Sequence, residues 1–376
     1  MIYFDNAATT LEKPQSVTRA VTHAMREMTT PGRGGHRAAR LAAETAYQCR
    51  ESLAELFRVP NPERIVFTHN ATHALNIAIK SLIAPGERAV ISGYEHNSVW
   101  RPLAAAGAEI VIAEGVPFAP EAMAASFAQA ITADTRLVAV NHVSNAFGYI
   151  LPITEIAALC RERGVPFVLD ASQSAGILEI DAMALGAAFI AMPGHKGLYA
   201  PQGTGVLICG TEKAKALMEG GTGSDSLHVH MPKFLPDRLE AGTHNMPGIA
   251  GLLAGVRFVQ ARGVTRILRH EQKLANAFVR GLRRLPGTVV YTAENAQEQA
   301  GVVSFNITGA NCETIGAALA AKQIATRTGL HCSPLAHQSA GTQQTGTVRV
   351  SFSVFNTMRQ VERCLRHLGR IAATGA

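Results

Sequence analysis

The segment Val165-Pro-Phe-Val-Leu-Asp170 decides the fold, because it is a short apolar run that ends at a carboxylate. Similar runs recur along the chain and are separated by Ala- and Leu-rich stretches with helical character. They are Arg64–Thr68, Arg88–Ser92, Arg136–Asn141, Ala187–Ala191 and Gly205–Cys209. Nearly continuous apolar strands that alternate with helices predict an α/β fold with a mostly parallel sheet covered on both faces.

The pattern changes near residue 258 of the 376-residue chain. A long helix is predicted over Arg257–Leu285, and strands follow near Thr288–Tyr291 and Gly301–Asn306. We therefore expect a large domain over residues 16–257 and a smaller α/β C-terminal domain over residues 258–376. Residues 1–15 are expected to form an N-terminal segment that packs near the active site.

Composition narrows the classes of function. The net charge is +7, but the basic residues are dispersed and no nucleic-acid-binding motif stands out, so we expect no nucleic-acid partner. Neither a signal peptide nor a membrane-spanning stretch is visible, and the six cysteines include no C-x-x-C pair, which together predict a soluble cytoplasmic protein with reduced thiols. His228-Val-His230 lacks further ligands at short spacing, so no metal is expected.

Lys196 and Asp170 suggest a pyridoxal 5′-phosphate (PLP) site. An aldehyde cofactor needs a lysine amine to hold it, and a carboxylate to keep its pyridine nitrogen protonated. Asp170 ends a predicted strand, and ligand groups of α/β folds gather at strand ends. Taken singly, Lys196 is better read as a surface lysine and Asp170 as a helix cap, and it is their combination that favours the cofactor site.

A phosphate-binding loop is predicted after the strand at Arg64–Thr68. The loop Thr68-His-Asn-Ala-Thr-His73 leads into a helical pattern, so backbone N–H groups and the Thr72 hydroxyl meet a helix N-terminus. An ordinary N-cap is the alternative. His96 and Gln173 also follow predicted strands, where an imidazole could stack on a cofactor ring and an amide could donate to the ring hydroxyl.

A resemblance to a known family rests on motifs that run in order along most of the chain. They are Tyr3-Phe-Asp-Asn-Ala-Ala-Thr-Thr10, Ala71-Thr72, Glu95-His96, Val143-Ser-Asn145, Asp170-Ala-Ser-Gln173, Gly194-His-Lys196, Glu240-Ala-Gly-Thr243, Arg327-Thr-Gly-Leu-His-Cys332 and Arg349. With these motifs the chain closely resembles the cysteine desulfurases, which belong to the class V aminotransferase group of fold-type I PLP enzymes.

The resemblance implies roles for the cofactor-binding residues. Lys196 is the Schiff-base lysine and moves the substrate α-proton, Asp170 pairs with the pyridine nitrogen, and His96 stacks on the ring. Gln173 contacts the ring oxygen. Ala71, Thr72 and His195 are expected at the phosphate, which Gly242 and Thr243 of a neighbouring subunit complete. The resemblance therefore implies a homodimer.

The resemblance also implies the substrate-binding groups. Asn145 and Arg349 match the positions that bind the substrate carboxylate, for which a guanidinium offers planar paired donors. Cys332 matches the nucleophile that attacks the sulfur of L-cysteine, takes it as a persulfide and leaves alanine. His331 or another cationic group is expected to favour the reactive thiolate. From composition alone, Cys332 would read as a buried structural thiol.

Two departures and the branch of the family complete these expectations. Pro193 stands where many relatives have a phosphate-binding serine, and Ala200 replaces a common glycine, so one phosphate contact is in question. The short stretch from Cys332 to Arg349 resembles the SufS/CsdA-like branch, which implies a sulfur-acceptor protein serving iron–sulfur cluster, thiocofactor or tRNA thiolation pathways. Selenocysteine lyases and cysteine sulfinate desulfinases share these residues and stay open. A Cys-independent PLP aminotransferase or lyase, and a non-catalytic binding protein, are more distant alternatives.

Overall fold

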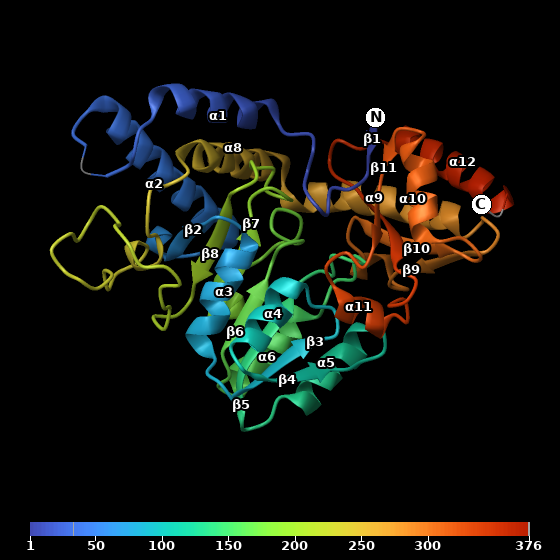
Figure 1. Cartoon of the computed structure of the whole chain (residues 1–376), viewed down its shortest axis with the longest axis horizontal. Coiled ribbons are helices and arrows are strands. Elements are labelled where there is room, and N and C mark those ends of the chain that lie inside the picture. Colours follow the sequence, from blue (N-terminus) through green and yellow to red (C-terminus); the bar gives the residue numbers. More distant parts are fainter. Residues whose placement is uncertain (33, 375–376) are drawn as a thin grey trace.

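The computed structural model describes residues 1–32 and 34–374, so residues 33, 375 and 376 of the predicted domains lie outside the description. Most of this chain is built on a seven-stranded sheet with the order β2-β8-β7-β6-β5-β3-β4 (Figure 1). Its strands are β2 (Ile65–Thr68), β3 (Arg88–Ser92), β4 (Glu109–Ala113), β5 (Thr135–Asn141), β6 (Phe167–Asp170), β7 (Phe189–Pro193) and β8 (Gly205–Cys209).

The predicted parallel sheet is confirmed for its centre. Strands β4, β3, β5, β6 and β7 pair in parallel, whereas β8 runs antiparallel to both β7 and β2. The six strands predicted for this sheet all form, with ends that differ by at most a few residues, and β4 is the one strand of the sheet that was not predicted. This strand lies at the sheet edge with its central residues partly exposed, although its sequence, Glu109-Ile-Val-Ile-Ala113, is an apolar run like those of the predicted strands.

Helices cover both faces of the sheet, as predicted. Helices α3 and α4 share one apolar core with the sheet, and α2, α5, α6 and α8 share another on the opposite face. The helices of this part are α1 (Gln15–Glu27), α2 (Arg37–Phe57), α3 (Ala71–Leu82), α4 (Asn97–Ala105), α5 (Pro120–Ala130), α6 (Ile153–Glu162), α7 (Ala182–Leu185) and α8 (Met246–Arg262).

The C-terminal part contains a second sheet, with the antiparallel order β12-β13-β10-β9, and its own apolar core. Its elements are α9 (Val264–Leu282), β9 (Thr288–Tyr291), β10 (Val302–Ile307), α10 (Cys312–Ala320), β11 (Ile324–Ala325), β12 (Arg327–Gly329), α11 (Pro334–Ser339), β13 (Thr347–Ser351) and α12 (Met358–Thr374). Strand β1 (Ile2–Tyr3) pairs with β11, so the N-terminus lies beside this part (Figure 1). Outside the seven-stranded sheet, β1, β11, β12 and β13 were not predicted either.

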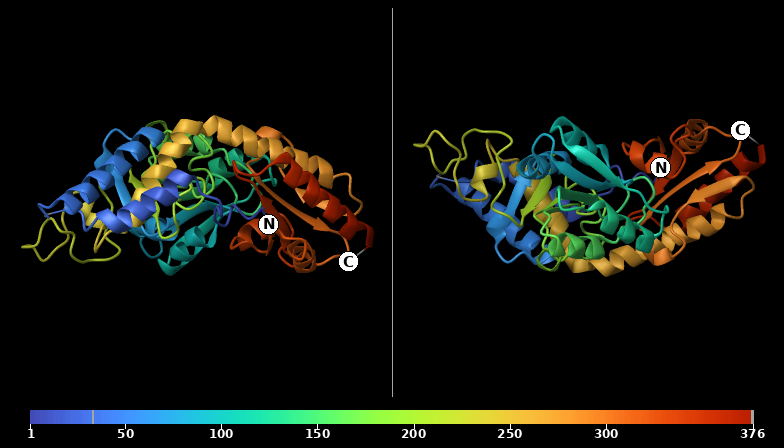
Figure 2. Two further views of the ribbon diagram at one scale, coloured as in Figure 1. Left: turned by 90° about the horizontal axis from the view of Figure 1, so that it is seen from above. Right: turned by 90° about the horizontal axis from the view of Figure 1, so that it is seen from below.

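The prediction of a single helix over Arg257–Leu285 is wrong, because the helix is interrupted at Gly263. Helix α8 ends there and α9 begins directly afterwards, with Gly263 at φ 83°, a conformation that glycine adopts without strain. Figure 2 shows α8 and α9 following one another along one side of the molecule, from the large sheet to the C-terminal part. The proposed domain boundary at residues 257 and 258 therefore falls inside α8, before the break.

None of the described helices meets the length and apolarity needed to cross a bilayer.

Candidate active site

The site lies where the parallel strands end. Strand β6 ends at Asp170 and β5 ends at Asn141, while His96 follows β3, and the loop after β7 carries His195 and Lys196. Because these strands are parallel, their carboxyl ends share one edge of the sheet. The fold thus brings together side chains that are far apart in the sequence.

A cavity of about 200 Å³ at this edge is lined by all of the predicted site residues except Gly242 and Thr243. The predicted residues that line it are Ala71, Thr72, His96, Asn145, Asp170, Gln173, His195, Lys196, Cys332 and Arg349. Pro193 also lines the cavity and offers no hydroxyl, while Ala200 is fully buried behind it.

The electrostatics of the cavity suit an aldehyde cofactor. Burial lowers the pKa of Lys196 to about 8, and the Asp170 carboxylate opposes that shift. An amine with this pKa is far more often neutral, and thus nucleophilic, than an ordinary lysine. Asp170 is only 3% exposed, and its Oδ1 accepts a hydrogen bond from the Ser172 amide at 2.9 Å. A buried carboxylate facing a cavity is a suitable partner for a protonated ring nitrogen.

His96 and Gln173 are held by their neighbours. The His96 Nδ1 accepts a hydrogen bond from the Ser98 amide at 3.0 Å, and burial, together with Lys196, lowers its pKa to about 4, so the ring is neutral near pH 7. Gln173 donates from Nε2 to the carbonyl of Ala7 at 2.9 Å, which fixes its amide at the cavity wall. Both orientations are compatible with the predicted ring contacts.

The predicted anion site lies at the beginning of helix α3. Helix α3 begins at Ala71, and Asn70, rather than Thr72, is the N-cap, with Oδ1 accepting from the His73 amide at 2.8 Å. Within the described residues, the amides of Ala71 and Thr72 have no recorded acceptor, as expected for the first positions of a helix. Together with the Thr72 hydroxyl they form a set of donors suited to a phosphate.

The N-terminal segment contributes directly to this site. Its Asp5 Oδ1 accepts from Arg349 Nη2 at 2.8 Å, its Ala7 carbonyl receives Gln173, and its Thr10 amide donates to the His195 carbonyl at 3.1 Å. The sequence analysis gave these residues no roles of their own, although they belong to the Tyr3–Thr10 motif.

Cys332 is the one exposed thiol among the described cysteines, and it faces the cavity. The reading of Cys332 as a buried structural thiol, which composition alone favoured and the resemblance reversed, is therefore wrong. Burial, with Arg349 nearby, lowers the pKa of His331 well below 6.5, so this histidine is neutral. The cation beside the sulfur is Arg327, whose Nη2 lies 3.7 Å from Sγ. Arg327 is the other cationic group that the motif contained without an assigned role.

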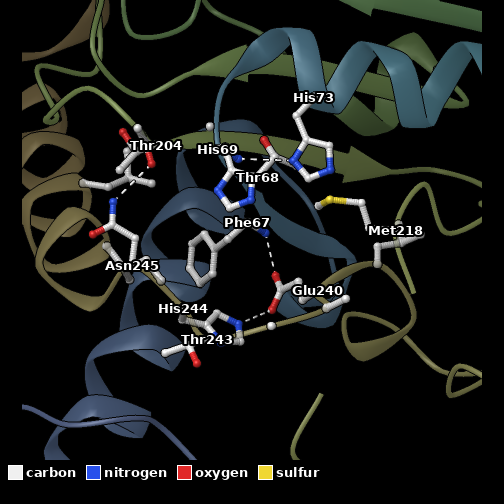
Figure 3. A pocket seen from close by; sticks show the side chains of 17 residues that line it. Phe67, Thr68, His69, His73, Thr204, Met218, Glu240, Thr243, His244 and Asn245 are labelled. Carbon is white, nitrogen blue, oxygen red and sulfur yellow. Dashed lines mark hydrogen bonds and ion pairs between the residues drawn. The ribbon is translucent and has the colours of Figure 1, made fainter. Parts of the chain in front are cut away.

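Gly242 and Thr243 line a separate cavity with Phe67, Glu240 and His244 (Figure 3). Both residues are exposed, and within one chain they do not reach the cavity of Lys196. Glu240 fixes the chain just before them. Its carboxylate accepts from the Phe67 amide at 2.6 Å and forms a buried ion pair with Arg50 at 2.6 Å. The exposed Gly242–Thr243 pair thus follows directly after a residue, Glu240, that buried bonds hold in place.

Comparisons with known proteins agree with this geometry. A family model described as Aminotransferase class-V matches residues 2–364. A protein named "Probable cysteine desulfurase" from Pyrococcus abyssi is 34% identical over 97% of this chain and 92% of its own length. A protein of the same name from Mycolicibacterium paratuberculosis is also 34% identical over 100% of this chain, which spans 56% of that longer relative.

Solved structures include a similar fold over nearly the whole chain. The apo structure of the cysteine desulfurase from Thermococcus onnurineus NA1 has a TM-score of 0.93 and 33% sequence identity. The similarity covers 99% of this chain and 95% of that one. The predicted fold class, α/β of fold type I, is therefore confirmed.

Proposed function

The chain belongs to the aminotransferase class-V family, among its cysteine desulfurases, and from this membership we propose that it is a PLP-dependent enzyme that removes sulfur from L-cysteine. The observation that carries the proposal is that Cys332 faces the same cavity as Lys196 and Asp170. An exposed thiol that shares a cavity with a cofactor-type lysine and carboxylate has a clear use in sulfur transfer and little use in a Cys-independent aminotransferase.

The residues present fit the cofactor. Lys196 would hold its aldehyde and Asp170 its ring nitrogen, while Thr72, with the free amides of α3 and His195, would hold the phosphate. When bound, PLP supplies an electron sink for the substrate carbon framework. Asp170 keeps that sink protonated, and Lys196, with its lowered pKa, moves the substrate α-proton.

Cys332 performs the sulfur transfer. Its thiolate attacks the substrate sulfur, so that an S–S bond forms on Cys332 while the Cβ–S bond breaks. The bonding electrons stay with the substrate carbons, which take up protons and leave as alanine. Arg327 faces the sulfur with positive charge, and Arg349 offers its guanidinium to the substrate carboxylate.

The proposed assembly is a homodimer in the cytoplasm. Gly242 and Thr243 are exposed and held by Glu240, which supports the idea that they complete the phosphate site of a second copy. Because Cys332 is exposed, its persulfide sulfur would be open to an acceptor protein of the kind that the SufS/CsdA-like branch uses. The destination proposed for that sulfur is iron–sulfur cluster assembly or a thiolation pathway.

The test measures alanine formation by the PLP-loaded protein from L-cysteine, L-selenocysteine and cysteine sulfinate. We expect L-cysteine to be consumed with Cys332 intact and hardly at all by Cys332→Ala, because sulfur leaves poorly without a nucleophile. Activity confined to selenocysteine or to the sulfinate would assign the protein to those lyase activities instead. Activity on L-cysteine that survives in Cys332→Ala would support the Cys-independent alternative.

A further inference from the structure

Cys332, the proposed nucleophile, lies on a short turn, Leu330–Ser333. The buried side-chain amide of Asn145 forms hydrogen bonds to the residues on either side of Cys332. Asn145 donates from Nδ2 to the His331 carbonyl at 2.7 Å. Its Oδ1 accepts from the Ser333 hydroxyl at 2.5 Å. Asn145 is 6% exposed and Ser333 is fully buried, so water cannot readily replace either bond.

These hydrogen bonds matter because the backbone of the turn is strained. His331 has φ 51° and Cys332 has φ 61°, so two successive residues other than glycine lie in the left-handed region. Such conformations persist only where the surrounding structure enforces them. A further bond, from the Asn97 amide to the Cys332 carbonyl at 2.9 Å, ties the turn to the residue after His96.

Asn145 also contacts the cationic side of the cavity. Its backbone carbonyl accepts from Arg349 Nη1 at 2.8 Å. One residue therefore bonds to the turn that carries the thiol and to the guanidinium proposed to bind the substrate carboxylate. The distance between these two groups determines whether a bound substrate presents its sulfur to Cys332.

We propose that Asn145 is a positioning residue that locks the Cys332 turn, in addition to the contact with the substrate carboxylate that the resemblance implies. This inference rests on the proposed function for its kinetic consequences. Both ends of the Asn145 amide bond to the turn, and the second N–H of its amide nitrogen has no part in these two bonds, so the same side chain can hold the turn and meet a carboxylate. A small misplacement of a reacting group is costly, which gives the lock its value.

Ser333→Ala separates the two roles of Asn145. Ser333 is not one of the described residues that line the cavity, so its hydroxyl cannot contact the substrate. Its side chain does not cap α11 either, and its removal breaks only the bond to Asn145. Asn145→Ala breaks both bonds. Ser126→Ala is the matched control, because Ser126 is a buried serine whose hydroxyl donates to a backbone carbonyl far from the turn.

The first readout is hydrogen exchange and does not depend on activity. The amides of Ser333 and Asn97 donate to carbonyls of the turn, so they report whether it is locked. We expect both amides to exchange at least about tenfold faster in Asn145→Ala and faster, by a smaller factor, in Ser333→Ala. Ser126→Ala should leave them unchanged. Wild-type exchange rates in both turn variants would overturn the proposal.

The second readout is the division between kcat and KM for L-cysteine. Ser333→Ala should lose between about 10- and 100-fold in the rate of persulfide formation with KM nearly unchanged, and Asn145→Ala should lose at least as much. A neutral Ser333→Ala, together with an Asn145→Ala that only raises KM as Arg349→Ala does, would show that Asn145 binds the substrate carboxylate and does not lock the turn. If the wild-type protein does not act on L-cysteine, the proposed function falls, whereas the exchange measurement still decides whether Asn145 locks the turn.

Discussion

The Asp5 carboxylate lies 2.8 Å from Nη2 of Arg349, so the beginning of the chain and strand β13 meet at the wall of the cavity. Arg349 is only 1% exposed, and its Nη1 bonds to the Asn145 carbonyl. Its Nε is buried and has no partner among the described residues. The guanidinium is therefore fixed in place by two of its five N–H groups, and its remaining donors, the Nε–H among them, are available where we propose that it meets the substrate carboxylate.

Arg349→Ala should raise KM for L-cysteine about 10- to 100-fold, the loss expected when hydrogen bonds to a charged group are removed. PLP should stay bound, because the proposed partner of Arg349 is the substrate. Arg349→Lys is the matched control, since it keeps the charge and loses the planar fork, and it should give a smaller rise. Steady-state kinetics check this, and an unchanged KM would exclude the role.

The lowered pKa of Lys196 predicts how the uptake of PLP depends on pH. Its pKa lies near 8, below the ordinary 10.5, so the ammonium form predominates below that pH and the neutral amine above it. The rate at which the apo-protein takes up PLP should therefore rise between about pH 7 and pH 9 and then level off. Stopped-flow absorbance follows the uptake.

Asp170→Asn gives the sign of the electrostatic effect on Lys196. The Asp170 carboxylate raises the pKa of Lys196, so removing its charge should shift the midpoint of the uptake profile to lower pH. Asp134→Asn, a change to an exposed aspartate at another place, should leave the midpoint alone. A midpoint near 10 in the wild-type protein would show that Lys196 is not buried as described.

Arg327 should speed the reactions of Cys332. Its guanidinium lies 3.7 Å from the sulfur, and the negative sulfur is the nucleophile, so Arg327→Ala should slow alkylation by iodoacetamide several-fold near neutral pH. Arg327→Lys keeps the charge and should retain most of the rate. The other five cysteines are buried, so mass spectrometry of the Cys332 peptide reads the reaction cleanly. Equal rates in Arg327→Ala and wild type would contradict the pairing.

The two copies of the proposed dimer should complement one another. Lys196→Ala should be inactive, and Thr243→Ala should retain PLP about tenfold less tightly. Mixed dimers contain one site with both Lys196 and a wild-type Thr243, so mixing the two variants at limiting PLP should restore about a quarter of the wild-type activity. No recovery on mixing, or a fully active monomer of 39.9 kDa in light scattering, would exclude the shared site.

Local patterns in the sequence predicted most of the fold and the cavity residues that follow the ends of the parallel strands. Buried strands such as β6 are marked by continuous apolar residues, and β6 ends at Asp170, the carboxylate that lines the cavity. The edge strand β4 carries the same mark in Ile110-Val-Ile-Ala113 and was predictable from it, although it was overlooked. The break at Gly263 was missed because the helical pattern continues on both sides of a single glycine.

The walls of the cavity depend on contacts that local patterns do not contain. Asp5 and Arg349 are 344 residues apart, and Asn145 and His331 are 186 apart, so no spacing rule connects them. The motifs placed these residues in the site, but only the folded chain shows which atoms they use. For the same reason, the sequence suggested His331 as a cation beside Cys332, whereas its burial leaves it neutral and Arg327 takes that place.

The most direct test of the account is the fate of the substrate sulfur. The PLP-loaded protein is incubated with L-cysteine and digested, and the Cys332 peptide is weighed by mass spectrometry before and after a reductant. The account predicts one added sulfur on Cys332 that the reductant removes, formed together with alanine, and neither product at a comparable rate from Cys332→Ala. An added sulfur found on another cysteine, or wild-type desulfuration by Cys332→Ala, would contradict it.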